Sequence, residues 1–490
     1  MSSQPSSAVT ASDRPVPALM DGASHHLIDG RLVPGVGSFE VIDPAVGEAF
    51  ALCPDASHAQ LDDAVAAARR AFPAWAALGF DARRAHLKAL ADVLRNHAQQ
   101  IGPLLSREQG KPIGHAVQEL AIAGLHVEHL AALDLSDELL REDERGRVEI
   151  RWKPLGVVGG IAPWNFPIAL AMHKVAQALY TGNTLILKPS PYTPLSTLAV
   201  AAAAQHVFPA GVFNVIAGGN DLGAWMTSHG AIDKISFTGS IATGKKVLAS
   251  AAQTLKRVTL ELGGNDPAIV LADADLDQAA AGIARSGFYN AGQICMAVKR
   301  VYVADAAHDD FLALLKARVE ALNTGPGDQP GVDMGPVQNR MQYDKVVSLL
   351  RDALASPDAR IDAGGQVREG SGYFIEPTVI SGLDEQSPLV REEQFGPVMP
   401  VMRFTDIDDA IDRANGTRFG LGASVWSRDT DKAVDVAARL DAGTVWINRH
   451  GINESDVPFG GFKESGYGRE HGVHGMRSYM EMQVISNLRG

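Results

Sequence analysis

The chain has 490 residues, of which 46% are apolar and 21% are charged, a composition that argues against disorder and, at this length, predicts two or three domains. The formal net charge of −13 argues against a nucleic-acid or anionic-membrane partner, because those surfaces select basic proteins. Two cysteines are too few for a disulfide framework and favour a cytoplasmic location.

The N-terminal residues 1–20 are rich in Ser, Pro and Ala and lack the apolar core of a signal peptide, so we predict a loose tail there. Two long apolar stretches, 154–173 and 189–220, contain internal Pro and Gly. We therefore predict no membrane-spanning helix in them. The 15 histidines show no paired ligand spacing, so we also predict no metal site.

The first third of the chain has the spacing of helices. Leu, Ala and Val recur with helical periodicity over 62–77, 82–100 and 106–133, with an interruption near Gly110–Pro112. Residues 134–153 are densely charged and then alternate apolar with polar positions, which predicts a half-exposed hairpin. Such a hairpin is either a solvated excursion or a strand pair that joins another subunit.

From residue 155 the pattern alternates strands with helices. The first expected strand opens at 156–159, and further strands are expected at 183–187, 212–217, 234–238 and 258–261. The expected helices lie at 169–180, 193–206, 222–228 and 244–254. Such alternation predicts a parallel sheet with right-handed crossovers, which binds nucleotides at the carboxyl ends of its strands. A second alternating run, 268–447, predicts a second α/β unit with a cleft between the two.

A glycine turn between a strand and a helix raises the question of an ATPase loop. Gly239, Gly244 and Lys245 match G-x-x-x-x-G-K, but Lys246 stands where an NTPase needs Ser or Thr for Mg²⁺. We therefore reject the ATPase interpretation. A turn that presents backbone N–H groups to a dinucleotide pyrophosphate fits better than one that only lets the helix pack.

The two cysteines have different sequence surroundings. Nothing in the sequence around Cys53 indicates a cleft, so this residue is interpreted as an inert buried thiol. Cys295 follows Gly292 at the junction between a predicted helix, 276–288, and an apolar run, 298–303, where a side chain can face a cleft. Lys299 and Arg300 follow closely, and the sequence leaves open whether they face the thiol.

An ordered set of motifs resembles the NAD(P)-dependent aldehyde dehydrogenase superfamily. The motifs are Pro163-Trp-Asn-Phe-Pro167, Leu187-Lys-Pro-Ser190, Phe237-Thr-Gly-Ser240, Leu260-Glu-Leu-Gly-Gly264, Gly292-Gln-Ile-Cys295, Glu393-Gln-Phe-Gly-Pro397 and Pro458-Phe-Gly-Gly461. Each is weak alone, but their order and family-like spacing over about residues 25–485 make the resemblance specific. It implies an α/β fold with a Rossmann-like dinucleotide-binding domain (21–133 and 154–261), a catalytic domain (262–475) and a small β arm for oligomerisation (134–153 and 476–490).

The resemblance implies oxidation of a small-molecule aldehyde to a carboxylic acid. Cys295 matches the thiolate that forms a thiohemiacetal and then a thioester, and Asn165 matches the amide that, with the Cys295 N–H, holds the oxyanion. Glu261 matches the general base for thioester hydrolysis. Lys174 and Glu470 match positions that some members use in proton relay.

Cofactor and substrate positions carry over in the same way. The residues matching cofactor contacts are Ile161, Ala162, Pro163, Trp164, Lys188, Ser190, Gly239, Ser240, Leu262, Glu393 and Phe395. Many NAD-preferring members place Glu three residues after the lysine, and this chain has Pro191, so NAD is favoured and NADP is the alternative. The residues matching the substrate tunnel are Phe166, His173, Tyr289, Met296 and Phe459. His173 is either a polar group for a polar, aromatic or carboxylated aldehyde or a helix histidine bonded to a neighbour, and Arg449 and His450 are further candidate anion contacts.

Three other functions remain as alternatives. CoA in place of water would make the enzyme a CoA-acylating semialdehyde dehydrogenase, although Glu261 disfavours this. A cofactor-independent cysteine hydrolase and a non-catalytic binding protein are the others. The resemblance also implies a homodimer or homotetramer joined through residues 134–153 and the terminal strand 479–487.

Overall fold

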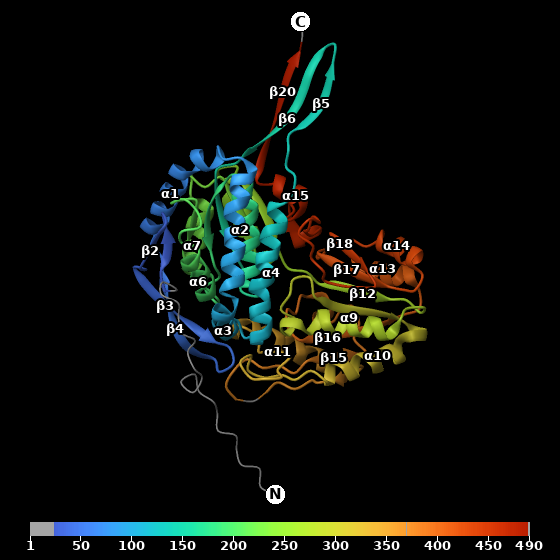
Figure 1. The fold of residues 1–490 in the computed structure, drawn as a ribbon. Helices are drawn as coiled ribbons and strands as arrows, with labels where there is room; N and C mark the ends of the chain where they lie inside the picture. The colour runs from blue at the N-terminus through green and yellow to red at the C-terminus, as the bar shows by residue number, and fades with distance from the viewer. Residues whose placement is uncertain (1–23, 369, 489–490) are drawn as a thin grey trace.

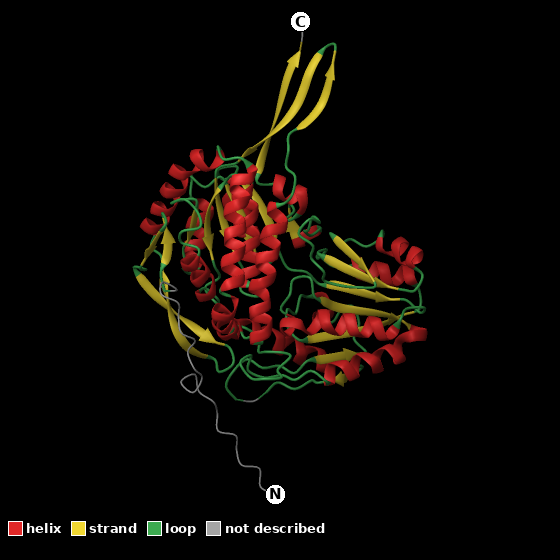
Figure 2. Cartoon of the chain, viewed as in Figure 1, coloured by secondary structure: helices red, strands yellow, loops and turns green. Residues whose placement is uncertain are grey.

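The structure is a computed structural model that describes residues 24–368 and 370–488. The predicted tail, 1–20, lies outside the described residues. Two α/β lobes lie side by side, and a three-stranded arm projects from the first lobe (Figure 1). Helices pack on the faces of both main sheets (Figure 2), so the α/β class predicted from the sequence is confirmed.

The first lobe is built on an eight-stranded sheet with the order β19-β11-β10-β7-β8-β9-β1-β2. Its strands are β1 (His26–Ile28), β2 (Arg31–Val33), β7 (Val157–Ile161), β8 (Thr184–Lys188), β9 (Phe213–Val215), β10 (Lys234–Thr238), β11 (Arg257–Glu261) and β19 (Gly466–Tyr467). The central five strands are parallel, and their chain order reverses between β7 and β10. Such a reversal point opens a crevice at the carboxyl ends of the strands.

Helices cover both faces of this sheet, and a separate hairpin lies at its edge. The helices are α1 (His58–Ala76), α2 (Phe80–Asn96), α3 (Ala98–Gln109), α4 (Ile113–Ala131), α5 (Pro167–Tyr180), α6 (Leu195–Ala203), α7 (Asn220–Ser228), α8 (Ile241–Ala252) and α15 (Gly472–Arg477). The hairpin pairs β3 (Gly37–Asp43) with β4 (Glu48–Asp55). A capping box of Ser57 and Gln60 starts α1. The helix expected over 82–100 breaks at His97 into α2 and α3, and none of the strands before residue 57 was expected from sequence.

The second lobe has a seven-stranded sheet with the order β14-β15-β16-β13-β12-β17-β18. Its strands are β12 (Asp266–Val270), β13 (Val298–Ala304), β14 (Arg360–Ala363), β15 (Thr378–Ser381), β16 (Val398–Phe404), β17 (Gly422–Trp426) and β18 (Thr444–Ile447). The helices around it are α9 (Leu276–Phe288), α10 (Asp305–Glu320), α11 (Arg340–Leu354), α12 (Pro388–Arg391), α13 (Ile407–Asn415) and α14 (Thr430–Ala437). All pairs are parallel except β14 with β15.

The arm is a separate antiparallel sheet of β5 (Glu138–Asp143), β6 (Gly146–Pro154) and β20 (Met480–Leu488). It joins two segments far apart in the sequence, and its outer part extends away from both lobes (Figure 1). Several of its apolar side chains are exposed, namely Leu139, Leu140, Met482 and Val484.

The junction of the lobes brings two sheet edges together. β11 ends at Glu261 and β12 begins at Asp266, so the chain passes from the carboxyl edge of the first sheet to the amino edge of the second within a few residues. The chain then returns: β19, in a segment assigned from sequence to the second unit, pairs antiparallel with β11. No helix among the described residues is long and apolar enough to cross a membrane.

Candidate active site

Cys295 lies in a tight loop between α9 and β13. Asn290, Ala291 and Gly292 all have positive φ, and a Cβ on Gly292 would lie 2.3 Å from the Gly396 carbonyl oxygen. This left-handed turn is therefore feasible only with glycine at 292. The Cys295 side chain is half-buried and packs with Met296 against a small cluster of Leu421, Trp446 and Phe459.

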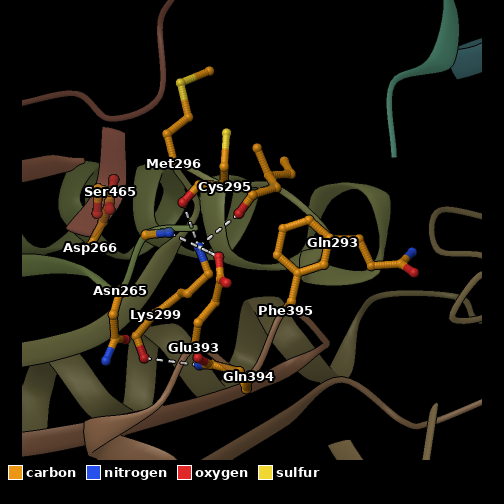
Figure 3. A network of polar contacts seen from close by, with 12 residues as sticks. Asn265, Asp266, Gln293, Cys295, Met296, Lys299, Glu393, Gln394, Phe395 and Ser465 are labelled. Atoms are coloured by element: carbon orange, nitrogen blue, oxygen red, sulfur yellow. Dashed lines mark hydrogen bonds and ion pairs between the residues drawn. The ribbon is translucent and has the colours of Figure 1, made fainter. Parts of the chain in front are cut away.

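The loop carbonyls on the far side of the thiol are bound by Lys299. Its ammonium donates to the carbonyls of Ile294 and Cys295, both at 2.7 Å, and lies 3.8 Å from Glu393 Oε1 (Figure 3). Arg300 instead donates to carbonyls on the opposite side, including that of Asn265. Lys299 therefore binds the backbone of the cysteine loop and does not point at its sulfur, and Arg300 binds carbonyls elsewhere.

Burial raises the pKa of the Cys295 thiol to about 12, although Lys299 opposes this rise. The carboxylates of Asp266, Glu261 and Glu393 also raise it, because a thiolate beside negative charge is disfavoured. At neutral pH the thiol form of Cys295 is therefore favoured over the thiolate.

Asn165 follows β7 and is buried just before α5. Its amide Nδ2 donates to the carbonyl of Gln293 at 2.9 Å, which brings this side chain against the cysteine loop. The amide has two N–H donors, so one remains for another acceptor. Asn165 therefore contacts the loop two residues before Cys295.

Glu261 is the last residue of β11 and is 4% exposed. Both carboxyl oxygens are buried and have no hydrogen-bond partner among the described residues. A Cβ on Gly460 would lie 2.8 Å from Glu261 Oε1, so the carboxyl group lies beside the segment that carries Phe459, which in turn clusters with Cys295. Burial, followed by the nearby Glu470 carboxylate, raises the pKa of Glu261 well above its usual value.

Lys174 and Glu470 form a buried ion pair with Nζ and Oε1 2.8 Å apart. Lys174 also donates to the hydroxyls of Ser236 and Thr238 on β10. Burial alone would raise the pKa of Glu470, but Lys174 and other donors lower it below the usual value. Of the two neighbouring carboxyl groups, Glu470 therefore holds the charge and Glu261 keeps its proton more readily.

Lys188, for which the family resemblance predicts an adenosine ribose contact, is the last residue of β8. Its side chain is buried, and burial lowers its pKa to about 8. Its ammonium makes one hydrogen bond, at 3.3 Å, to the Pro189 carbonyl. Ser190 is also buried and its hydroxyl accepts from the Tyr192 N–H.

The predicted pyrophosphate turn is the N-terminus of α8. Ser240 is the N-cap, and its hydroxyl accepts from the Thr243 N–H. The Gly239 N–H donates to the carbonyl of Glu261, and Leu262 packs against Gly244, where a Cβ would come within 2.6 Å of it. The first N–H groups of α8 therefore lie at the carboxyl edge of the sheet, close to β11.

Glu393 and Phe395 lie on the other side of this edge. Glu393 Oε1 accepts from the Gly264 N–H at 2.9 Å, and Phe395 has a positive φ of 50°. The rings of Phe395 and Trp164 meet edge to face at 5.3 Å. The remaining predicted cofactor residues continue β7 at its carboxyl end, and they are Ile161, Ala162 and Pro163.

The residues that the resemblance assigns to a substrate tunnel make contacts near Asn165 and Cys295. The rings of Phe166 and Tyr289 stack at 6.4 Å, and Phe459 and Met296 lie beside Cys295. Arg449 is exposed and lies 3.7 Å from Glu454, whereas His450 is buried against the Met296 carbonyl.

His173 belongs to a chain of three histidines. Its Nε2 is 2.7 Å from His126 Nδ1, and its Nδ1 is 3.0 Å from His471 Nε2. Burial lowers the pKa of all three rings. Both nitrogens of His173 are thus occupied by neighbours, which matches the second sequence interpretation and leaves no ring nitrogen of His173 for a substrate.

Sequence reasoning missed the residues that hold the Asn165 turn. Lys111 pairs with Glu119 and donates to the Asn165 carbonyl at 3.0 Å, while Asn290 donates to the same oxygen. Glu119 also accepts from two N–H groups at the start of α5. The helix break at Gly110–Pro112 was visible, but nothing in the sequence showed that Lys111 turns inward there.

Comparison with known proteins identifies the class. The family model for the aldehyde dehydrogenase family matches residues 33–485. A betaine aldehyde dehydrogenase from Rhizobium leguminosarum is 39% identical and covers 94% of this chain and 96% of its own length. An NAD⁺ complex of an aldehyde dehydrogenase from Bacillus cereus has a TM-score of 0.91 at 34% identity, covering 94% of this chain and 96% of that one. An E. coli structure described as an NADP-dependent enzyme has the same TM-score at 36% identity, covering 94% and 97%.

The chain belongs to the aldehyde dehydrogenase family. It is therefore an oxidoreductase whose general reaction is the oxidation of aldehydes with NAD(P). Within the described residues no group of three or more His, Cys, Asp or Glu side chains is arranged to hold a metal ion.

Proposed function

We propose that this protein oxidises an aldehyde to a carboxylic acid through covalent bonding to Cys295. The observation that carries the proposal is the convergence of Cys295, Asn165 and Glu261 where the carboxyl edge of one sheet meets the amino edge of the other. The cysteine supplies the nucleophile, the amide a donor for the developing oxyanion, and the buried carboxyl group a base.

The residues at the sheet edge fit a dinucleotide. The buried Lys188 ammonium has one long hydrogen bond, so donors remain for ribose hydroxyls, and the start of α8 offers N–H groups for a pyrophosphate. Glu393 would hold the second ribose, with Phe395 and Trp164 beside it. When bound, the nicotinamide accepts the hydride that leaves the substrate carbon.

The protein groups then act in a fixed order. The Cys295 thiol first gives its proton to solvent water. The resulting thiolate adds to the carbonyl carbon, and the carbonyl electron pair moves onto oxygen, where the Cys295 N–H and the Asn165 amide stabilise it. After oxidation has left a thioester on Cys295, Glu261 takes a proton from water, and the hydroxide releases the acid. A carboxyl group that is buried and unpartnered, like Glu261, has the raised basicity this role needs. Lys174 and Glu470 are proposed to carry the proton onward.

NAD is the favoured cofactor in this proposal. The side chain of Pro191 cannot bond a ribose hydroxyl, but Asp55 lies close enough to Lys188 to affect its pKa. A Cβ on Gly218 would meet Asp55 Oδ1 at 3.0 Å. A carboxylate at this position disfavours a 2′-phosphate by like-charge repulsion. The location is proposed to be cytoplasmic, supported by the two free thiols.

The arm supports a homodimer or homotetramer. Its exposed apolar side chains and free strand edge are typical of a surface that pairs with another chain. Size-exclusion chromatography with light scattering tests this, and a monomer at micromolar concentration would contradict it.

The reaction is tested by turnover of aliphatic, aromatic and semialdehyde substrates with NAD⁺ and with NADP⁺. We expect reduced cofactor and a free acid in equal amounts, with higher kcat/KM for NAD⁺. Mass spectrometry of the products with CoA present separates acid from acyl-CoA. Absence of reduced cofactor with every aldehyde, from protein whose Cys295 still reacts with iodoacetamide, would overturn the proposal.

A further inference from the structure

Side chains bind every carbonyl of the segment that carries the nucleophile. Asn165 donates to the Gln293 carbonyl at 2.9 Å, and His450 Nε2 is 2.9 Å from that of Met296. Between them, Lys299 donates to both Ile294 and Cys295. The loop has no strand or helix partner here, so these side chains, together with the Ala297 N–H that donates to the Ile294 carbonyl at 3.1 Å, set its peptide orientations.

Lys299 is the central member of this set. Its side chain is 2% exposed, and its ammonium has three donors, two of which go to the loop carbonyls. The remaining direction faces Glu393, at 3.8 Å, and the ring of Phe395, at 5.9 Å. One buried cation therefore contacts both the cysteine loop and the carboxylate of Glu393, which is proposed to hold a ribose of the cofactor.

The geometry of a peptide fixes what this contact does. Within one planar peptide the carbonyl of residue i and the N–H of residue i+1 point in opposite directions. With the Ile294 carbonyl held at Lys299, the Cys295 N–H points away from Lys299. Figure 3 shows the Cys295 sulfur on that same side, directed away from the ammonium.

The Cys295 N–H is also unused. It donates to no group in the part of the chain that the structure describes, while its neighbours Gln293 and Ala297 donate to backbone carbonyls. An unpaired N–H beside a nucleophile is a donor ready for a developing oxyanion. A cation on the carbonyl of the same peptide withdraws electrons from it and strengthens this donor.

We propose that Lys299 is a positioning residue for the oxyanion site: it fixes and polarises the 294–295 peptide so that the Cys295 N–H receives the substrate oxygen. This inference rests on the proposed function. In the step concerned, the thiolate forms the S–C bond, the C=O electron pair moves onto oxygen, and that charge is shared by the Cys295 N–H and the Asn165 amide. Nothing is oxidised or reduced in this addition.

A simple electrostatic role for Lys299 must be separated from positioning. The charges that act on the pKa of the Cys295 thiol are Lys299, which lowers it, and Asp266, Glu261 and Glu393, which raise it. Removing Lys299 therefore also reduces the thiolate fraction. Alkylation by iodoacetamide depends on that fraction but forms no oxyanion, so it serves as an internal measure of it.

The experiment compares Lys299→Met with the matched control Lys345→Met. Lys345 is an exposed lysine whose charge also acts on Glu393 but which makes no contact with the loop. For Lys299→Met we expect aldehyde oxidation, as kcat/KM, to fall about 10²-fold, and at least about tenfold more than iodoacetamide alkylation at the same pH. Ester hydrolysis by Cys295 without cofactor should fall in parallel with oxidation. Lys299→Arg should restore part of the loss, and Lys345→Met should change neither rate.

Two results would overturn the inference while leaving the proposed function intact. One is equal loss of oxidation and alkylation in Lys299→Met, which would mean that Lys299 acts on the thiolate alone. The other is unchanged oxidation in that variant. Failure of the wild-type enzyme to oxidise any aldehyde would instead contradict the proposed function.

A measurement on wild-type protein covers the case in which the variant does not fold. A crystal structure with an aldehyde and no cofactor would contain the thiohemiacetal on Cys295. We expect its oxygen within about 3.2 Å of the Cys295 nitrogen, with Lys299 still on the Ile294 carbonyl. An oxygen directed away from that nitrogen would refute the inference.

Discussion

The two cysteines of the chain lie in regions that treat the same side chain differently. Cys53 is in the strand β4, opposite Phe39 of β3, and is fully buried in the core of the first lobe. Cys295 is in a loop between a helix and a strand, and the residue is only partly buried. Burial raises the pKa of both thiols.

The difference between these regions lies in the backbone and in access. The backbone around Cys53 pairs with a neighbouring strand, so it offers nothing to a ligand. The carbonyls around Cys295 are bound by side chains, which leaves its N–H free beside the sulfur. A raised pKa therefore does not distinguish the thiol proposed as the nucleophile from the thiol buried in the core, whereas the arrangement of donors around each thiol does.

The most severe test is the exchange of each cysteine for alanine. Cys295→Ala should lower aldehyde oxidation by at least about 10⁴-fold, because no other group can form the thioester. Cofactor reduction followed by absorbance checks this, and Cys53→Ala is the matched control with unchanged turnover. Residual activity above about 1% in Cys295→Ala would show that Cys295 is not the nucleophile.

Glu261→Gln should separate the two halves of the reaction. Steady-state turnover should fall about 10²–10⁴-fold because water loses its base, while the first turnover still yields reduced cofactor. Since burial raises the pKa of Glu261 and only the ionised form is a base, wild-type deacylation should increase with pH through that raised pKa. Rapid-mixing kinetics measures both phases, and equal loss of burst and steady state would mean that Glu261 acts before the thioester.

The pH dependence of alkylation sharpens the contrast between the thiols. With the pKa of Cys295 at about 12, its thiolate fraction and its rate with iodoacetamide should rise about tenfold per pH unit from neutral to alkaline pH. Cys53 should stay unlabelled in folded protein. Peptide mass spectrometry quantifies both sites, and a plateau for Cys295 near neutral pH would show that its thiolate is stabilised beyond what this structure contains.

Much of this site was predictable from the sequence because its residues lie in ordered motifs. The alternation of strands and helices predicted both sheets, and the family's motifs predicted Cys295, Asn165 and Glu261 at their junction. The direction of the Lys299 side chain was not predictable. Lys299 is the second residue of a buried strand, and nothing in the neighbouring sequence shows that its ammonium turns back to the loop carbonyls. The pairing of β19 with β11 was missed for a similar reason: it joins residues about 200 positions apart.

The histidine chain shows the same limit. His126, His173 and His471 come from α4, α5 and the segment before α15, and only the packing of those elements brings them together. From the sequence, only His173 was a candidate tunnel residue. Its two interpretations, a group that contacts substrate and a histidine bonded to a neighbour, differed only in the contacts that its ring would make. Tertiary contacts, not residue type, decided between them.

Lys188→Met tests the proposed contact between the Lys188 ammonium and the cofactor ribose. Losing its donors should raise the KM for NAD⁺ about tenfold, with kcat changed less, because the contact is remote from the reacting carbon. Titration of cofactor binding by protein fluorescence gives the affinity directly. A fall in kcat at unchanged affinity would place Lys188 in the chemistry instead.

The smallest expected effect belongs to Cys53, whose thiol lies close enough to Lys188 to influence its pKa. Because Cys53 is neutral at working pH and its side chain is fully buried, Cys53→Ala should only weaken packing, by about 1–2 kcal/mol in the free energy of unfolding. Cys53→Ser should cost more, since a buried hydroxyl must find a partner. Urea unfolding measures the free energy of unfolding of both variants, and NAD⁺ titration measures their cofactor affinity. A change in cofactor affinity above about threefold in Cys53→Ala would contradict this prediction. It would mean that packing around Cys53 helps to position the Lys188 ammonium for the cofactor.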